Sequence, residues 1–213
     1  MESPLRPPDK PGFRLIETMG WHPGTGIPRR DRHLRRLEET AAALGIVPRD
    51  VVETLDTLAA DAPMRVRLTV DRRGGAEVTT APFTPLPQGT VWRLGLSPHR
   101  LDSANPWLRV KTTERALYDT ARAAMPAGVE ELVFLNEIGE LAEGTITNLF
   151  IEMGDGLLTP PVASGLLPGV LREELLATGR ARVQVLGMEH LMAASAIYAG
   201  NSLRGLIPAR FVG

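Results

Sequence analysis

Lys111 has the surroundings that most clearly suggest chemistry. It lies in the segment LRVKTTERALYD (108–119), after an apolar run expected to be a strand and before two threonines. A lysine is usually a solvated surface residue, but a lysine that only improves solubility rarely has such neighbours. A desolvated, partly neutral lysine at the end of a strand is able to act as a nucleophile and a base. The neighbours of Lys111 therefore make it a candidate functional residue, with a surface lysine as the simpler alternative.

A second segment offers a place for an anion. SGLLPGVLREELL (164–176) contains Leu-Pro-Gly ahead of a helix that we expect to start after Pro168 and to end at Gly179. The free backbone N–H groups at the start of a helix suit a phosphate. A proline in the first helical turn is also common for structural reasons alone. The segment by itself leaves both interpretations open.

Three further segments place polar side chains at regular positions. RHLRRLEETAAALG (32–45) is typical of an amphipathic helix with a basic face, NEIGELAEGTITNLFIE (136–152) of a hairpin with acidic residues, and YAGNSLRGLIP (198–208) of a polar turn at the end of a strand. Each pattern has an ordinary structural explanation. None of the five segments predicts a function by itself.

Strands alternate with helices along the chain, which predicts an α+β (mixed α/β) fold. The proline-rich stretch 81–89 is the expected linker, so we predict an N-terminal α/β domain over 1–85 and a C-terminal α/β domain over 86–213 that carries Lys111. The expected strands are 13–19, 64–70, 76–80, 91–97, 108–111, 131–136, 147–153, 182–186 and a final pair within 196–212, and the expected helices are 31–44, 49–60, 114–125, 169–178 and 189–194.

The composition argues against several classes of function. A formal net charge of −1 gives no strong field toward nucleic acid or an anionic membrane. The absence of cysteine excludes disulfides, thiolate metal sites and cysteine nucleophiles. The four histidines lack ligand spacing, so we expect no metal site. No apolar run reaches the roughly 18 residues that span a bilayer, and the first residues lack the apolar core of a signal peptide. The sequence therefore predicts a cytosolic protein.

In this order, the five segments resemble the class IV aminotransferases over residues 13–210. The most specific matches are the pattern E-x-G-x-x-x-E-G-x-x-x-N-[LIF]-F around Glu143 and the L-P-G-[VI] pattern that follows it. The resemblance implies an enzyme that depends on pyridoxal 5′-phosphate (PLP). It also implies the two-domain fold of the D-amino-acid aminotransferases, with the cofactor in the cleft between the domains, and a homodimer.

The resemblance assigns roles residue by residue. Lys111 matches the lysine that binds PLP covalently and then moves a proton. Glu143 matches the carboxylate that faces the pyridine nitrogen, with Glu137 and Glu140 as nearby rivals. Arg36 matches the arginine that binds the phosphate through its guanidinium fork.

The remaining implied cofactor contacts come from the later segments: Tyr118, Val170, Leu171, Asn201 and Ser202. Tyr118 is the candidate for the phenolic oxygen of PLP. Val170 and Leu171 would offer backbone N–H groups to the phosphate. The family often has threonine at the Leu171 position, so only the backbone contact carries over. Asn148 is expected to be a structural hydrogen-bonding residue behind Glu143.

Two segments bring the resemblance closest to the 4-amino-4-deoxychorismate lyases of this family, KTTERALYD (111–119) and GNSLRGLIPAR (200–210). The implied reaction releases pyruvate and forms 4-aminobenzoate for folate biosynthesis, in cooperation with an aminodeoxychorismate synthase. The candidate contacts to the substrate carboxylates are Thr18, Arg65, Arg67 and Arg93. Arg65 and Arg67 alternate along a strand and equally fit a solvated face.

Two alternatives stay open. The same cofactor apparatus serves a class IV aminotransferase acting on branched-chain, D-amino or other amino acids, and a fold does not choose between the two activities. A PLP-binding protein with little turnover is the third possibility.

Overall fold

The computed structural model describes residues 5–9, 11–154 and 156–213, and the chain forms two compact units. The first unit comprises the chain up to Pro85 together with Val110–Glu114, and the second comprises Leu86–Arg109 and Arg115–Gly213. Helices and strands occur in both units, which confirms the expected mixed α/β class. The chain passes from the first unit to the second after Pro85, within the proline-rich stretch 81–89. The short segment that holds Lys111 is grouped with the first unit.

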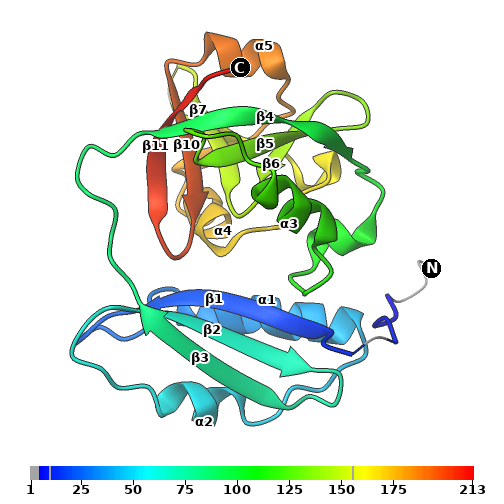
Figure 1. The fold of residues 1–213 in the computed structure, drawn as a ribbon, viewed down its shortest axis with the longest axis vertical. Coiled ribbons are helices and arrows are strands. Elements are labelled where there is room, and N and C mark those ends of the chain that lie inside the picture. Colours follow the sequence, from blue (N-terminus) through cyan, green and yellow to red (C-terminus); the bar gives the residue numbers. More distant parts are fainter. Residues whose placement is uncertain (1–4, 10, 155) are drawn as a thin grey trace. The chain divides into compact units, whose positions relative to one another are not determined.

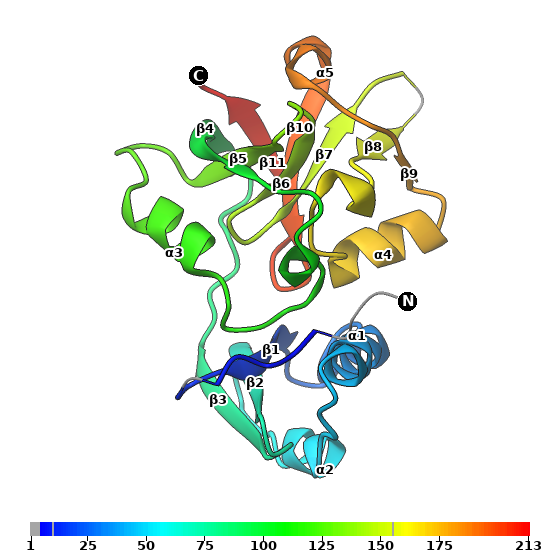
Figure 2. The same cartoon turned by 90° about the vertical axis from the view of Figure 1, so that its right-hand side faces the viewer.

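The first unit contains an antiparallel sheet in the order β1-β2-β3. Figure 2 shows α1 along one side of this sheet. Its elements are β1 (Arg14–Trp21), α1 (Arg30–Ala43), α2 (Val51–Asp56), β2 (Met64–Asp71) and β3 (Ala76–Pro82).

Burial in β2 has a period of two, as the sequence predicts, whereas β1 is buried more continuously. Leu15, Glu17 and Met19 are buried in β1, and Val66 and Leu68 are buried in β2. Because successive side chains of a strand point to opposite faces, these residues share one face of the sheet. That face packs against α1, and Glu17 is the only charged residue among these five.

The expected helix 31–44 is confirmed as α1. The N-cap is Arg29, in the left-handed region at φ 61°, and Asp31 lies within the first turn. Gly45 follows the helix at φ 66°, the conformation that glycine adopts most readily after a C-terminus. The second helix is shorter than the expected 49–60, because α2 ends at Asp56.

The residues around Lys111 do not form the strand expected at 108–111. Pro106–Arg109 form a short 3₁₀ helix, η1. The next residues pair with the free edge of β1 instead. The N–H of Ile16 donates to the carbonyl oxygen of Lys111 at 2.9 Å, and the N–H of Thr113 donates to that of Arg14 at 2.9 Å. The backbone of Lys111 is thereby fixed to β1.

The second unit contains a sheet in the order β10-β11-β4-β5-β6-β7-β8-β9, and β10 also pairs with β7, so the strands from β10 to β7 close on themselves (Figure 1). Its elements are β4 (Trp92–Leu101), η1, α3 (Ala116–Ala123), β5 (Glu131–Asn136), β6 (Leu141–Gly144), β7 (Asn148–Glu152), β8 (Leu157–Thr159), η2 (Val162–Ser164), α4 (Val170–Ala177), β9 (Ala181–Val183), α5 (Met188–Ala193), β10 (Ala196–Asn201) and β11 (Gly205–Phe211).

Among the described residues, apolar clusters stabilise this unit. The largest lies among the closed strands and includes Leu94, Val133 and Ile151. A second holds α3 against β5, and a third holds α4 through Leu171 and Leu175. Every residue of β5 is buried, which explains its nearly continuous apolar sequence. Within the described part of the chain, no helix has the length and apolar character needed to cross a membrane.

Candidate active site

A hairpin in the second unit carries Glu143. Glu143 lies in β6 opposite Asn148 of β7, one residue before the strand ends at Gly144, and the chain turns through residues 145–147. Its side chain is buried, and its Oε1 accepts a hydrogen bond of 2.6 Å from the hydroxyl of Tyr118 on α3. The sequence placed both residues at the cofactor, and the structure brings these two together.

The hydroxyl of Tyr118 stays protonated in this environment. Burial raises the pKa of Tyr118, and the charge and hydrogen bond of Glu143 raise it further. The ring of Tyr118 packs edge-on against Phe134 with 5.3 Å between the ring centroids. Tyr118 is therefore a fixed donor toward a buried carboxylate over the whole working range of pH.

The start of α4 presents backbone donors with no side-chain cap. Gly169 is the N-cap, with extended backbone at φ −70° and ψ 144°, and Val170 and Leu171 form the first turn. The first N–H groups of a helix lack partners within the helix, and they carry a partial positive charge. The side chain of Leu171 lies in the apolar cluster with Phe150, so only its backbone is available for a ligand.

Gly169 approaches Asn148 too closely for any larger residue. A Cβ at this position would lie 1.9 Å from Oδ1 of Asn148. The amide of Asn148 in turn donates through Nδ2 to the carbonyl oxygen of Leu167 at 2.9 Å. Asn148 therefore joins the Glu143 hairpin to the chain entering α4, which agrees with the structural role that we expected for it.

Asn201 is the last residue of β10 and Ser202 follows it, beside the same helix. A Cβ on the preceding Gly200 would lie 3.1 Å from Cδ2 of Leu171, so the strand end and the first turn of α4 are in contact. Asn201 donates through Nδ2 to the carbonyl oxygen of Ile146 at 3.3 Å. It thus also reaches the tip of the Glu143 hairpin.

The two rival carboxylates are engaged elsewhere. Glu137 accepts hydrogen bonds from the backbone N–H and the hydroxyl of Ser103 at 2.8 and 2.6 Å. Glu140 accepts from Asn136 at 3.0 Å and from Ser164 at 2.6 Å. Each of these carboxylates therefore joins its own segment to a serine that is distant in the sequence.

In the first unit, Arg36 is part of a buried charged group that the sequence did not predict. Nε and Nη2 of Arg36 donate to the two oxygens of Glu17 at 2.8 and 2.6 Å, and Nδ1 of His33 lies 2.6 Å from Oε2. Glu17 is fully buried. Burial acts to raise its pKa, but the charge of Arg36 and the hydrogen bonds from His33 and Arg36 outweigh this and lower the pKa to about 2.

Lys111 also acts on this group. Burial lowers the pKa of His33, Glu17 opposes that effect, and the positive charges of Arg36 and Lys111 lower it further. His33 is therefore neutral near pH 7 and donates from Nδ1 to Glu17, which can only accept. The sequence offered one signal for Glu17, an acidic residue at a position where the strand pattern requires the core.

The substrate candidates fall in two places. On β2, Arg65 and Arg67 are exposed on the face opposite α1, and Thr18 is the cross-strand partner of Arg67. Arg93 is engaged in the second unit, where Nη2 contacts Oε1 of Glu130 at 3.0 Å. The structure therefore groups three of the four candidates.

The second unit has features that suit a phosphorylated pyridine. The uncapped start of α4 suits a phosphate, and a buried carboxylate such as Glu143 suits a protonated ring nitrogen. Arg172, in the first turn of α4, adds a buried cation whose Nε has no hydrogen-bond partner within the described residues. The residues present thus fit the cofactor that the sequence resemblance implies.

Comparison with known proteins agrees with this reading. The family model described as amino-transferase class IV matches residues 14–212. A provisionally named amino-acid aminotransferase from Mesorhizobium loti has 48% identity and a TM-score of 0.91, over 94% of this chain and 100% of that one. The 4-amino-4-deoxychorismate lyase from Pseudomonas aeruginosa has 26% identity and a TM-score of 0.80, over 93% of this chain and 82% of that one.

Matches to the curated branched-chain-amino-acid aminotransferases are shorter. The Escherichia coli enzyme is 34% identical over 91 residues, which are 40% of this chain and 29% of the relative. Structures that share the fold contain PLP. The chain therefore belongs to the class IV amino-transferase family of PLP-dependent enzymes, which includes aminotransferases and aminodeoxychorismate lyases.

Proposed function

We propose that this enzyme is a 4-amino-4-deoxychorismate lyase, which releases pyruvate and forms 4-aminobenzoate. The segments KTTERALYD and GNSLRGLIPAR support this choice within the family. The similarity to the P. aeruginosa lyase over most of both chains supports it as well. A class IV aminotransferase acting on branched-chain amino acids is the second candidate, because part of the chain is similar to the enzymes of that name.

The observation that favours the lyase is the chemistry of one face of the β1–β3 sheet. Lys111 lies opposite Ile16 across the edge of β1, and directly opposite residues project to the same face. Thr18 and Arg67 follow on that face, and Arg65 is two residues from Arg67. Two guanidinium groups suit a substrate with two carboxylates. An aliphatic amino acid would require an apolar surface instead.

Each residue then has a defined task. A proton leaves the substrate ring carbon that bears the amine and the C–O bond to the enolpyruvyl group breaks. The released enolpyruvate takes up a proton on its methylene carbon, so the products are pyruvate and 4-aminobenzoate. Lys111 is the proposed base. When bound, PLP supplies the electron sink for this step. Glu143, held by Tyr118, would keep a proton on the pyridine nitrogen, and the start of α4 would bind the phosphate.

Arg36 has a different environment from the one that its proposed role suggests. Two of its N–H groups already donate to Glu17, so its contribution to phosphate binding would come from its other N–H groups and its charge. Glu17 fixes the direction of the guanidinium fork. We therefore assign the phosphate mainly to the backbone of α4 and treat Arg36 as an additional contact.

The proposal is tested with the purified enzyme and PLP. The bound cofactor should absorb near ~410–430 nm, and the band should be absent in Lys111→Ala. Adding 4-amino-4-deoxychorismate should yield 4-aminobenzoate, measured by fluorescence, and an equal amount of pyruvate. A band that bleaches on adding branched-chain amino acids, without 4-aminobenzoate, would establish the aminotransferase. If the wild-type enzyme shows neither response, the remaining interpretation is a PLP-binding protein with little turnover.

We extend the proposal to the setting of the enzyme. A homodimer in the cytosol that receives its substrate from an aminodeoxychorismate synthase would fit the proposed reaction. Sedimentation at micromolar concentration tests the dimer, since a monomer would contradict it.

A further inference from the structure

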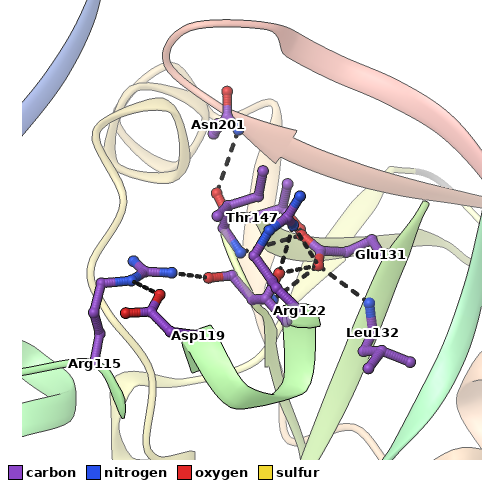
Figure 3. Close-up of polar contacts among 9 residues, drawn as sticks. Arg115, Asp119, Arg122, Glu131, Leu132, Thr147 and Asn201 are labelled. Carbon is purple, nitrogen blue, oxygen red and sulfur yellow. Dashed lines mark hydrogen bonds and ion pairs between the residues drawn. The ribbon is translucent and has the colours of Figure 1, made fainter. Parts of the chain in front are cut away.

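A second buried carboxylate lies beneath the hairpin that carries Glu143. Glu131, the first residue of β5, is fully buried. Its Oε1 accepts hydrogen bonds from the N–H groups of Leu132 and Thr145 at 3.1 and 3.0 Å, and from the hydroxyl of Thr145. Its Oε2 accepts from the N–H of Ile146 at 3.1 Å and from the hydroxyl of Thr147 at 3.0 Å. Figure 3 shows these donors converging on the carboxylate.

Gly144 leaves the space that this carboxylate occupies. A Cβ at Gly144 would lie 2.9 Å from both Cγ and Cδ of Glu131, and 2.5 Å from the hydroxyl oxygen of Thr147. Gly144 directly follows Glu143 in the chain. The glycine of the E-G motif is therefore required by Glu131, which packs directly beneath the backbone at the end of β6.

One face of α3 holds the same turn. Arg115, Tyr118 and Arg122 are spaced by three and four residues, so they project to the same side of the helix. Arg115 donates to the carbonyl oxygen of Thr145 at 2.9 Å, and Arg122 donates to the hydroxyl of Thr145 at 2.8 Å. The middle residue, Tyr118, is the one that binds Glu143.

The turn is also held from the end of β10. Asn201 donates to the carbonyl oxygen of Ile146, and Arg122 adds a charge 3.6 Å from Oε1 of Glu131. Figure 3 shows Asn201 and Arg122 reaching the turn from different elements. Glu131 binds the backbone of the turn, while α3 and β10 bind its carbonyl groups.

We infer that Glu131 is a positioning residue, which fixes the turn at 145–147 and so orients the carboxylate of Glu143 and the side chain of Asn201 toward the cofactor. This inference rests on the role of Glu143 in the proposed function. Glu131 is fully buried beneath the turn, acts through backbone and threonine groups, and has no part in the chemistry itself.

Glutamine cannot replace Glu131 at this site. A carboxylate accepts on both oxygens, whereas an amide presents one acceptor and one donor. Backbone N–H groups face Oε1 from Leu132 and Thr145, and another faces Oε2 from Ile146. Either orientation of the amide therefore sets its NH₂ against a backbone N–H. A threonine hydroxyl is able to rotate and accept, but a backbone N–H is not.

The test uses Glu131→Gln in the full chain, with Glu130→Gln as the matched control. Glu130 is the neighbouring residue, but it pairs with Arg93 and its side chain is partly exposed. The two readouts are amide hydrogen exchange over residues 144–148 and the dissociation constant and absorbance of bound PLP. We expect Glu131→Gln to lose protection at Thr145 and Ile146, to weaken PLP binding roughly tenfold, and to shift the cofactor absorbance. Glu130→Gln should change none of these.

Unchanged exchange at Thr145 and Ile146, or increased exchange with unaltered PLP affinity and absorbance, would overturn the inference. If Glu131→Gln does not fold, Thr145→Val and Thr145→Ser decide instead. Valine removes the hydroxyl that Glu131 and Arg122 bind, and serine keeps it. We expect weaker PLP binding in the valine variant and rescue by serine, and equal values in both would overturn the inference. Because neither readout requires 4-aminobenzoate, failure of the lyase assay would leave this result intact.

Discussion

The hydroxyl of Tyr118 lies 2.6 Å from Oε1 of Glu143, and the raised pKa of Tyr118 keeps it a donor in this pair. We expect Tyr118→Phe to weaken PLP binding by about 10-fold, because a hydrogen bond to a buried charged group contributes about 1.5–3 kcal/mol. The measurement is a titration of PLP absorbance. The packing of the ring against Phe134 is kept in the variant, but the buried carboxylate of Glu143 loses its donor, so the melting temperature should fall as well. Unchanged PLP affinity would show that the pair serves the fold alone.

The Glu17–Arg36 pair predicts that the free energy of unfolding depends on pH. The pKa of Glu17 falls from 4.5 to about 2 on folding, so the native state holds this proton less tightly than the unfolded chain. The resulting stabilisation is present above pH ~4.5 and is lost as the pH falls toward ~2, and it amounts to about 3 kcal/mol. Urea unfolding measured between these pH values should show this loss.

Glu17→Gln provides the comparison. The substitution leaves the buried guanidinium of Arg36 without its charge partner, so the variant should be less stable by about 3–5 kcal/mol at pH 7. Its stability should also fall less steeply below pH 4.5. A variant with the same acid dependence as the wild type would assign that dependence to other carboxylates.

The close approach of Gly169 to Asn148 predicts a steric cost. In Gly169→Ala the added Cβ would meet Oδ1 of Asn148 at 1.9 Å, so the asparagine or the start of α4 must move. We expect a loss of about 1–3 kcal/mol in the free energy of unfolding, together with weaker PLP binding. Gly179→Ala is the control at the other end of α4, where φ is +71° and no neighbour lies within 4 Å. It should lose stability through backbone strain and leave PLP affinity unchanged.

The exposed guanidinium of Arg67 predicts an effect on substrate binding. Arg67→Ala should raise KM for 4-amino-4-deoxychorismate by roughly 10-fold, because a charge-assisted contact to a carboxylate is lost. The absorbance of bound PLP should stay the same. Arg72→Ala is the matched control, since Arg72 forms an exposed ion pair with Asp9 in the same unit. An equal KM in both variants would remove Arg67 from the proposed substrate site.

The sequence predicts local structure well where periodicity decides it. The alternation in β2 and the spacing of apolar residues in α1 follow from which side chains must be buried, and both elements occur as expected. The strand expected at 108–111 fails for a different reason. The partner of this segment is β1, and the contact between Arg14 and Thr113 joins residues 99 positions apart. Local sequence does not contain such a pairing.

The buried carboxylates show the same limit for the candidate site. Lys111, Glu143 and the start of α4 belong to motifs that are read from contiguous residues. Glu17 and Glu131 depend on donors from distant elements, and acidic residues in a sequence are normally solvated. Their one local signal is a charged residue at a position where the strand pattern calls for the core.

The assignment of Val110–Glu114 to the first unit has a consequence for engineering. The chain passes from one unit to the other after Pro85, after Arg109 and after Glu114. A gene fragment ending at the proline-rich stretch would lack the lysine that pairs with the edge of β1, and the complementary fragment would contain that lysine without its β1 partner. Chimeras with relatives must therefore exchange the 110–114 segment together with the first 85 residues. A single crossover after residue 85 would take Lys111 from one parent and the sheet that fixes its backbone from the other.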